Sequence, residues 1–350
     1  MMRKLNVIVS VLLVMMVALT ACGGNNTGKT ANTEKTNTTN AEAGNEAKNY
    51  DGVTIKIGVQ GSGGLFGKAR EEKWFEQEFE KLGVNVEWTE FQSGPPMTEA
   101  IASNKLDIAT LGNMPVVAGQ SAGIPFTIIS QTLEGTNNVA ILVASDSTAT
   151  SLADLKGKKI AVTKGSNAYN FLYRGLKDAN LSDSDIEVIQ LQPDEAQPAF
   201  ESGGVDAWVT WDPYITLNSA SGKAKVLEDG ESLGVFSPSF TIARTAFTDD
   251  YPELVTLYQK VINKTLAWEL ANEDEALERY AAERDIPVEI IAGTFDRARM
   301  INIAVSDDVI AELQKTADFQ FEIKNIRKEV KVADIVDNQF INAALQEPLE

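Results

Sequence analysis

The sequence predicts an α/β fold of two lobes that are joined by two hinge strands. Apolar, β-branched runs alternate with runs of helical spacing, and this alternation starts a second time near residue 151. Alternating strands and helices are typical of sheets covered by helices on both faces. Roughly 300 residues follow the N-terminal segment, which is enough for two lobes of ordinary domain size.

The first lobe is expected to contain residues 53–142 and 239–350. Its opening half predicts strands at 53–60, 84–92 and 106–112, with helices at 68–83 and 93–105 between them and a further helix from 113. Because strands alternate with helices, we expect a largely parallel sheet. Such sheets bind ligands at the carboxyl ends of their strands.

The second lobe is expected to contain residues 143–238. It begins with a strand, a tight turn and a helix in "IAVTKGSNAYNFLYRGL", residues 160–176, and continues with predicted elements at 186–192, 193–204, 205–212 and 224–229. The two crossings between the lobes are predicted near 141–146 and 236–243. A further strand within "SPSFTIARTAF", residues 237–247, is followed by helices rich in Ala, Leu and Glu from Asp249 onward.

The N-terminus has the pattern of an export signal. Arg3 and Lys4 precede an apolar run from Val7 to Leu19, which is too short and wrongly flanked for a stable membrane span. The sequence Leu-Thr-Ala-Cys then predicts a signal peptide at 1–21 and lipidation of Cys22, the chain's single cysteine. Residues 22–52 are rich in Asn, Thr, Ala, Gly, Lys and Glu and predict a disordered tether.

Composition excludes several functions. The net charge is −19, so nucleic acid is not an expected partner. The chain has no histidine, which excludes Ser-His-Asp and Cys-His nucleophilic sites and the usual zinc ligand sets. We therefore expect no catalytic residues, no metal and no cofactor. A small anion can still bind an acidic protein, because local N–H groups outweigh distant, screened charges.

Four expected strand ends carry small or amide residues at or just before a helix start. These turns are Gln60-Gly61-Ser62, Ser93-Gly94-Pro95-Pro96, Gly112-Asn113-Met114-Pro115 and Gly165-Ser166-Asn167. The first N–H groups of a helix lack partners within it, and the helix dipole is positive there, so such turns can hold an anion. Ser and Asn also cap helices for stability alone, so both interpretations stay open for each turn. Lys164 is expected to be solvated.

The stretch "VDAWVTWDPY", residues 205–214, predicts a strand that ends in an indole and a carboxylate. The odd spacing of Trp208 and Trp211 places them on opposite faces of a strand. One of them is therefore expected in the core, while Trp211 and Asp212 are candidates for the ligand site. The alternative is that both indoles fill cores and that Asp212 closes a turn before Pro213.

Five stretches are similar to solute-binding lipoproteins of ABC importers, in the aliphatic sulfonate, taurine and nitrate group. They are "FQSGPPMTEAI", "LDIATLGNMPVVAGQSAG", "SLADLKGKKIAVTKGSNAYNFL", "FESGGVDAWVTWDPY" and "VADIVDNQFI". The resemblance covers about residues 53–345 and implies a periplasmic-binding-protein-like fold of type II. It also implies an oxyanion surrounded by Gln60, Ser93, Gly94, Gly112, Asn113, Ser166 and Asn167. Trp211 and Asp212 would flank the organic end, and Gly61 and Met114 are further candidates from the same turns.

Two departures concern the solute. Many sulfonate binders have Gly-Asp-Thr-Pro where this chain has Gly112-Asn113-Met114-Pro115, and often a histidine in place of Tyr169. The resemblance implies a monomeric, lipid-anchored, extracytoplasmic receptor that delivers an alkanesulfonate to an ABC permease. Taurine, nitrate and a pyrimidine vitamin precursor are alternative solutes. An enzyme of the same fold and an adhesive surface protein are alternatives from other classes.

Overall fold

The computed structural model describes residues 50–61 and 65–349. The predicted signal peptide, Cys22 and nearly all of the predicted tether lie outside these residues, as does Ser62 of the first predicted turn. Within the described residues, no helix has the length and apolar character needed to cross a membrane.

The first sheet has six strands in the order β11-β4-β10-β3-β1-β2. Their bounds are β1 (Thr54–Gln60), β2 (Asn85–Phe91), β3 (Ile108–Gly112), β4 (Phe126–Glu134), β10 (Ser239–Arg244) and β11 (Arg299–Ile303). β1 pairs in parallel with β2 and β3, whereas β10 runs antiparallel to β3 and β4, and β11 runs antiparallel to β4. β11 was not predicted, since only helices were expected in this part of the tail.

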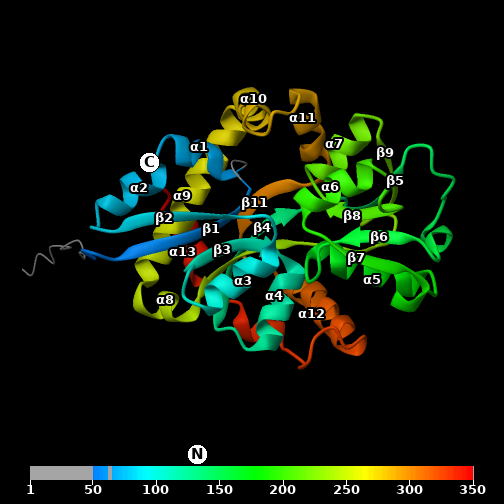
Figure 1. Ribbon diagram of the computed structural model, residues 1–350. Coiled ribbons are helices and arrows are strands. Elements are labelled where there is room, and N and C mark those ends of the chain that lie inside the picture. Colours follow the sequence, from blue (N-terminus) through cyan, green and yellow to red (C-terminus); the bar gives the residue numbers. More distant parts are fainter. Residues whose placement is uncertain (1–49, 62–64, 350) are drawn as a thin grey trace, which may run out of the picture. The chain divides into compact units, whose positions relative to one another are not determined.

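The second sheet has five strands in the order β7-β6-β8-β5-β9. Their bounds are β5 (Val139–Ala144), β6 (Lys159–Val162), β7 (Glu187–Gln190), β8 (Ala207–Trp211) and β9 (Ala224–Asp229). β6 pairs in parallel with β7 and β8, and β5 runs antiparallel to β8 and β9. Figure 1 shows the two sheets side by side.

The prediction of largely parallel sheets was wrong, because both sheets are mixed. The parallel pairs are those whose strands are joined through helices, as a parallel connection requires. β5 and β10 enter their sheets directly from the other sheet, without a helical crossover, and so run antiparallel to their neighbours.

The chain crosses between the sheets at 135–138, from β4 to β5, and at 230–238, from β9 to β10. The first crossing was predicted too late, at 141–146, and the predicted boundary at residue 142 falls inside β5. The predicted second crossing, at 236–243, includes most of β10. β5 pairs with β8 and β9, so residues 139–144 already belong to the second sheet.

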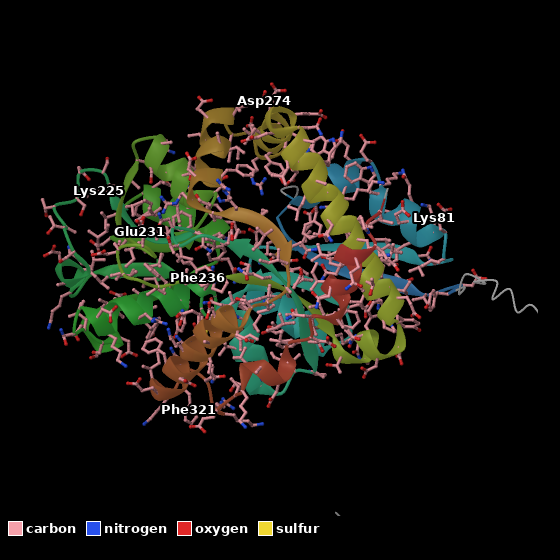
Figure 2. All side chains as sticks on the ribbon, turned by 180° about the vertical axis from the view of Figure 1, so that it is seen from behind. Lys81, Lys225, Glu231, Phe236, Asp274 and Phe321 are labelled. Carbon is pink, nitrogen blue, oxygen red and sulfur yellow. The ribbon has the colours of Figure 1, made fainter. Side chains whose placement is uncertain are left out.

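The two crossings touch each other. Asn138 Nδ2 donates to the Ser237 carbonyl at 2.8 Å, and Asn137 Nδ2 donates to Glu231 Oε2 at 3.0 Å. Glu231 and Phe236 mark the second crossing in Figure 2. Gly135 has φ +124, and a Cβ there would lie 2.7 Å from the Arg297 carbonyl oxygen, so this close approach requires glycine.

Helices cover both faces of the first sheet. They are α1 (Leu65–Glu71), α2 (Trp74–Glu80), α3 (Gly94–Ala102), α4 (Asn113–Ala122), α8 (Thr245–Asp250), α9 (Pro252–Ala271), α12 (Asp307–Glu322) and α13 (Gln339–Gln346), with a 3-10 turn, η3 (Val332–Ile335). Two apolar cores result, one centred on Phe75, Phe79 and Tyr258 and one on Met97 and Leu111. The predicted helix at 68–83 is broken at Lys73, whose φ of 56 is left-handed.

The second sheet is covered by α5 (Asn167–Asp178), α6 (Pro193–Glu201) and α7 (Tyr214–Ala220), with 3-10 turns η1 (Leu152–Leu155) and η2 (Asp183–Asp185). Two further helices, α10 (Glu273–Arg284) and α11 (Val288–Arg297), follow α9. α10 packs against α9 and α1 beside the first sheet, and α11 packs against α7 beside the second. In Figure 1 this helix pair lies above both sheets.

Candidate functional site

A cavity of ≈ 270 Å³ lies where the two sheets meet α10 and α11. One part of its lining, here called the turn wall, consists of Gln60 of β1, Thr110 and Gly112 of β3, and Asn167 at the start of α5. Another part, here called the helix wall, consists of Tyr280, Arg284, Ile291, Thr294 and Phe295 of α10 and α11. The remaining lining residues are Phe66, Leu133, Asn138, Trp211, Asp212, Pro213, Ser239, Ala298 and Met300.

Strand geometry positions the turn wall. β1 and β3 run in parallel, so Gln60 and Gly112 end at the same edge of the first sheet. Gln60 Nε2 donates to the Thr110 carbonyl at 3.1 Å. Asn167 starts α5 beyond the second sheet, and a Cβ on Gly112 would lie 3.1 Å from its Cγ. The turns of the two sheets therefore meet across the cavity.

Some of the helix N–H groups at these turns are used by local caps. Asn113 Oδ1 accepts from the Met114 N–H at 2.8 Å, and Asn167 Oδ1 accepts from the Ala168 N–H at 3.1 Å. Ser166 Oγ accepts from the Tyr169 N–H at 3.2 Å. These side chains stabilise the helix starts, as the capping interpretation predicts. The fully buried Asn113 Nδ2 has no hydrogen-bond partner among the described residues.

The structure brings some of the predicted site residues to the cavity and leaves others away from it. Gln60, Gly112, Asn167, Trp211 and Asp212 line the cavity. Gly61, Ser93, Gly94, Asn113, Met114 and Ser166 do not.

Packing explains several of these positions. Ser93 Oγ donates to Gln192 Oε1 at 2.9 Å. This bond joins the residue before α3, beside the first sheet, to the residue before α6, beside the second. A Cβ on Gly94 would lie 2.7 Å from Pro115, so Gly94 permits close packing of α3 on α4. Met114 belongs to the apolar core below the turn, and Gly61 is exposed. Lys164 is exposed, as predicted.

The two indoles of β8 lie on opposite faces of the second sheet. Trp208 is 1% exposed and belongs to one apolar core, while Trp211 packs against the other core and lines the cavity. The prediction that alternate faces separate these residues is confirmed.

Asp212 lines the cavity, but its carboxylate is already engaged. Oδ1 accepts from the Thr216 N–H at 3.0 Å and from the Thr216 hydroxyl at 2.7 Å, which caps α7. Oδ2 lies 3.2 Å from Arg297 Nε in an ion pair, and Arg297 Nη2 lies 3.8 Å from Asp229. Desolvation raises the pKa of Asp212. The hydrogen bonds from Thr216 and the charge of Arg297 act in the opposite direction but are outweighed.

The helix wall is built on a buried contact between α10 and α9. Tyr280 stacks on Phe295 with ring centroids 5.9 Å apart, and its hydroxyl donates to Glu269. Arg279 lies 4.0 Å from the same carboxylate oxygen. Burial raises the pKa of Glu269 to about 7. This contact fixes the aromatic face that the cavity presents to a solute.

Sequence reasoning missed the helix wall. Its residues come from a stretch rich in Ala and Glu, where the sequence predicted only helices. Helical spacing between Tyr280 and Arg284 places both on one face of α10, but nothing local indicates that this face meets the turns some 100 to 200 residues earlier in the chain. The missed set includes a cavity-lining cation, Arg284.

The arrangement suits a small molecule with an apolar body and an anionic group. Aromatic and aliphatic side chains supply much of the lining, and amides, hydroxyls and a guanidinium supply donors. Across the described ranges, no group of three or more His, Cys, Asp or Glu side chains is arranged to hold a metal.

Comparison with known proteins identifies the family. The model of the family described as NMT1/THI5 like matches residues 68–276. The chain belongs to the NMT1/THI5-like family. A Bacillus subtilis (strain 168) protein of this kind, which carries the name of an aliphatic sulfonates-binding protein, is 45% identical over 84% of this chain and 88% of its own length. The resemblance inferred from the motifs is thereby confirmed.

Two further relatives bear on the fold and the solute. The alkanesulfonate-binding protein SsuA of Xanthomonas axonopodis pv. citri, solved with bound MOPS, superposes with a TM-score of 0.75 at 29% identity, covering 82% of this chain and 99% of that one. A taurine-binding periplasmic protein of Escherichia coli (strain K12) is 28% identical over 59% of this chain and 64% of its own length. This NMT1/THI5-like chain has the periplasmic-binding-protein fold, as predicted.

Proposed function

We propose that this protein is an extracytoplasmic solute-binding protein of an ABC importer and that it binds an aliphatic sulfonate without a catalytic cycle. The observation that carries the proposal is the cavity where turns of both sheets meet, lined by amide donors of the turn wall and by the aromatic and aliphatic side chains of the helix wall. The names of the relatives from Bacillus subtilis and Xanthomonas support the same solute class.

The cavity favours an alkanesulfonate over the alternative solutes. The carboxylate of Asp212 is occupied by Thr216 and Arg297, so it has little capacity left for the ammonium group of taurine. Nitrate would leave the apolar lining of Trp211 and Phe295 without a partner. A pyrimidine vitamin precursor remains as a solute to be tested, because an aromatic ring also fits such a lining.

A panel of solutes in thermal unfolding tests this proposal. A ligand that binds only the folded state stabilises it by about 2.7 kcal/mol at a hundredfold excess over Kd. Ethanesulfonate is expected to raise the melting temperature more than propionate, because three sulfonate oxygens use more donors than two carboxylate oxygens. Equal shifts for both, or a larger shift with nitrate or an aminopyrimidine, would contradict the proposal.

The proposal includes the sequence-based placement of the protein. Lipid on Cys22 would anchor the mature chain at the outer face of the cell membrane, and residues 22–52 would serve as a tether. The protein would act as a monomer and deliver its solute to the permease. The crossings at 135–138 and 230–238 would act as the hinge between the lobes. Cys22→Ala is expected to move the protein from the membrane to the soluble fraction, since acyl chains provide the attachment. A variant that stays in the membrane would exclude the anchor.

A further inference from the structure

The helix pair α10 and α11 carries three arginines, and one of them differs from the other two. Arg279 lies near Glu269 and pairs with Glu283, and Arg297 pairs with Asp212 and Asp229. Arg284 lines the cavity, and among the described residues it makes neither an ion pair nor a hydrogen bond. A half-buried guanidinium that faces a cavity is therefore available to a solute.

Arg284 lies among aromatic rings and makes no ion pair with the described residues, while the charge of Asp194 acts on the neighbouring Tyr214. Its guanidinium carbon lies 6.0 Å from the centre of the Tyr280 ring. Desolvation raises the pKa values of Tyr214 and Tyr280, and the positive charge of Arg284 acts in the opposite direction on both. Arg284 therefore lies close to both tyrosines. The nearest carboxylate of the cavity lining, that of Asp212, is engaged with Arg297 and Thr216.

Arg284 and the turn wall line the same cavity but come from different elements. The turn wall takes its donors from strand ends of both sheets, whereas Arg284 is the last residue of α10. Apolar side chains, including Phe295 and Ile291, complete the helix wall beside Arg284. A solute with two anionic groups has a partner for each of these two sets of donors.

We propose that Arg284 binds a second anionic group at the far end of the solute, so that the preferred solute is a sulfonate that also bears a terminal carboxylate. This inference rests on the proposed function. The turn wall would hold the sulfonate, and the planar guanidinium would bind the carboxylate through two parallel N–H donors, a geometry that lysine does not reproduce.

The test compares two ligands of equal length, propane-1-sulfonate and 3-sulfopropanoate. The first ends in a methyl group where the second ends in a carboxylate. Both are titrated calorimetrically into the full chain, into Arg284→Gln and into Arg299→Gln. Arg299 is an exposed arginine of β11, next to Met300 of the cavity but outside the lining, so it controls for a general loss of positive charge. The wild type is expected to bind 3-sulfopropanoate at least about tenfold more tightly.

Arg284→Gln is expected to weaken 3-sulfopropanoate much more than propane-1-sulfonate and so to abolish that preference, and Arg299→Gln is expected to keep the preference. Equal affinities of the wild type for both ligands would overturn the inference. So would an equal loss of affinity for both ligands in Arg284→Gln, because Arg284 would then hold the sulfonate itself.

If Arg284→Gln does not fold, Arg284→Lys replaces it. A reduced preference for 3-sulfopropanoate is then the expected result, and an unchanged preference would contradict the inference. Binding of neither sulfonate by the wild type would instead refute the proposed function.

Discussion

The turn wall and the helix wall face the same cavity, but they are anchored by different kinds of contact. At the turns, the two sheets meet through neutral groups, the Ser93–Gln192 hydrogen bond and the close approach of Gly112 to Asn167. The helix wall is anchored by charged, mostly buried groups, with Arg297 bound to the second sheet and Tyr280 bound to Glu269 of α9.

This difference indicates which side of the cavity can open. Neutral hydrogen bonds between the lobes, such as Ser93–Gln192 and Gln320–Asn170, contribute about 1 kcal/mol each, so the turns can part at low cost. Breaking a buried ion pair costs about 3–5 kcal/mol, because it leaves an uncompensated charge. We therefore expect the helix wall to stay in place when the cleft opens, and the turn wall to separate.

The largest expected effect is that of Arg297→Gln. The substitution leaves Asp212 and Asp229, each at most 20% exposed, without their cation. We expect the free energy of unfolding to fall by about 3 kcal/mol, measured by urea titration of the ligand-free protein.

Lys177→Gln is the matched control for this substitution. Lys177 pairs with Glu322 at 2.8 Å, but the two side chains are 52% and 62% exposed. Solvent screens such a pair, so its loss is expected to change the free energy of unfolding by less than about 1 kcal/mol. Similar small losses in both variants would contradict a charged anchor at the helix wall.

The second effect concerns the pH dependence of the helix wall. Burial raises the pKa of Glu269 from its ordinary value of 4.5 to about 7, so the folded state favours the protonated carboxyl group. The resulting stability is fully present below pH 4.5 and is lost as the pH rises through 7. The loss is on the order of 3 kcal/mol, at 1.36 kcal/mol per pKa unit.

Glu269→Gln removes this titration. The variant is expected to unfold at a higher temperature than the wild type at pH 8 and to lose that advantage as the pH falls toward 4.5, because the glutamine stays neutral and its Oε1 can still accept from Tyr280. All other carboxylates titrate in the same way in both proteins, so their contributions cancel in the difference between the two unfolding temperatures. A difference that does not vary with pH would show that Glu269 is ionised throughout.

Three residues of the turn wall, Gln60, Gly112 and Asn167, could be named from the sequence because each ends a strand or starts a helix within one short motif, whereas Thr110, inside β3, was not predicted. Gly112-Asn113 and Ser166-Asn167 carry both the turn and the helix start in consecutive residues. Strand alternation likewise separated Trp208 from Trp211. Capping and ligand binding use the same residue types, however, so local pattern did not distinguish Ser166, a cap, from Asn167, which lines the cavity.

The helix wall could not be predicted, since its position depends on tertiary packing. Tyr280 and Arg284 face the cavity because Glu269 fixes α10 on α9 and because Arg297 joins α11 to two carboxylates of the second sheet. Asp212 and Asp229 lie far from Arg297 in the sequence, and Glu269 belongs to a different helix from Tyr280. The same holds for β11, which pairs only with β4, some 170 residues earlier in the chain.

The smallest expected effect is that of Ser93→Ala at the turn wall. The Ser93 hydroxyl donates to Gln192, so its loss removes one hydrogen bond between the first sheet and α6, worth about 1 kcal/mol. If this bond forms only when the cleft is closed, the variant is expected to bind an alkanesulfonate about fivefold more weakly in calorimetric titration, with little change in the unfolding of the ligand-free protein. Ser103→Ala, which removes a hydroxyl bonded to the Glu99 carbonyl within α3, is the control and is expected to leave affinity unchanged.

Gln192 separates this interpretation from the one implied by the family resemblance, in which Ser93 contacts the oxyanion. If Ser93 and Gln192 act as a pair, Gln192→Ala weakens binding as much as Ser93→Ala does, and the double variant is no weaker than either single one, because both substitutions remove the same bond. If Ser93 instead donates to the solute, Ser93→Ala weakens binding and Gln192→Ala does not. The second pattern would mean that the turn wall includes Ser93, and that in the occupied cleft its hydroxyl turns from Gln192 toward the sulfonate.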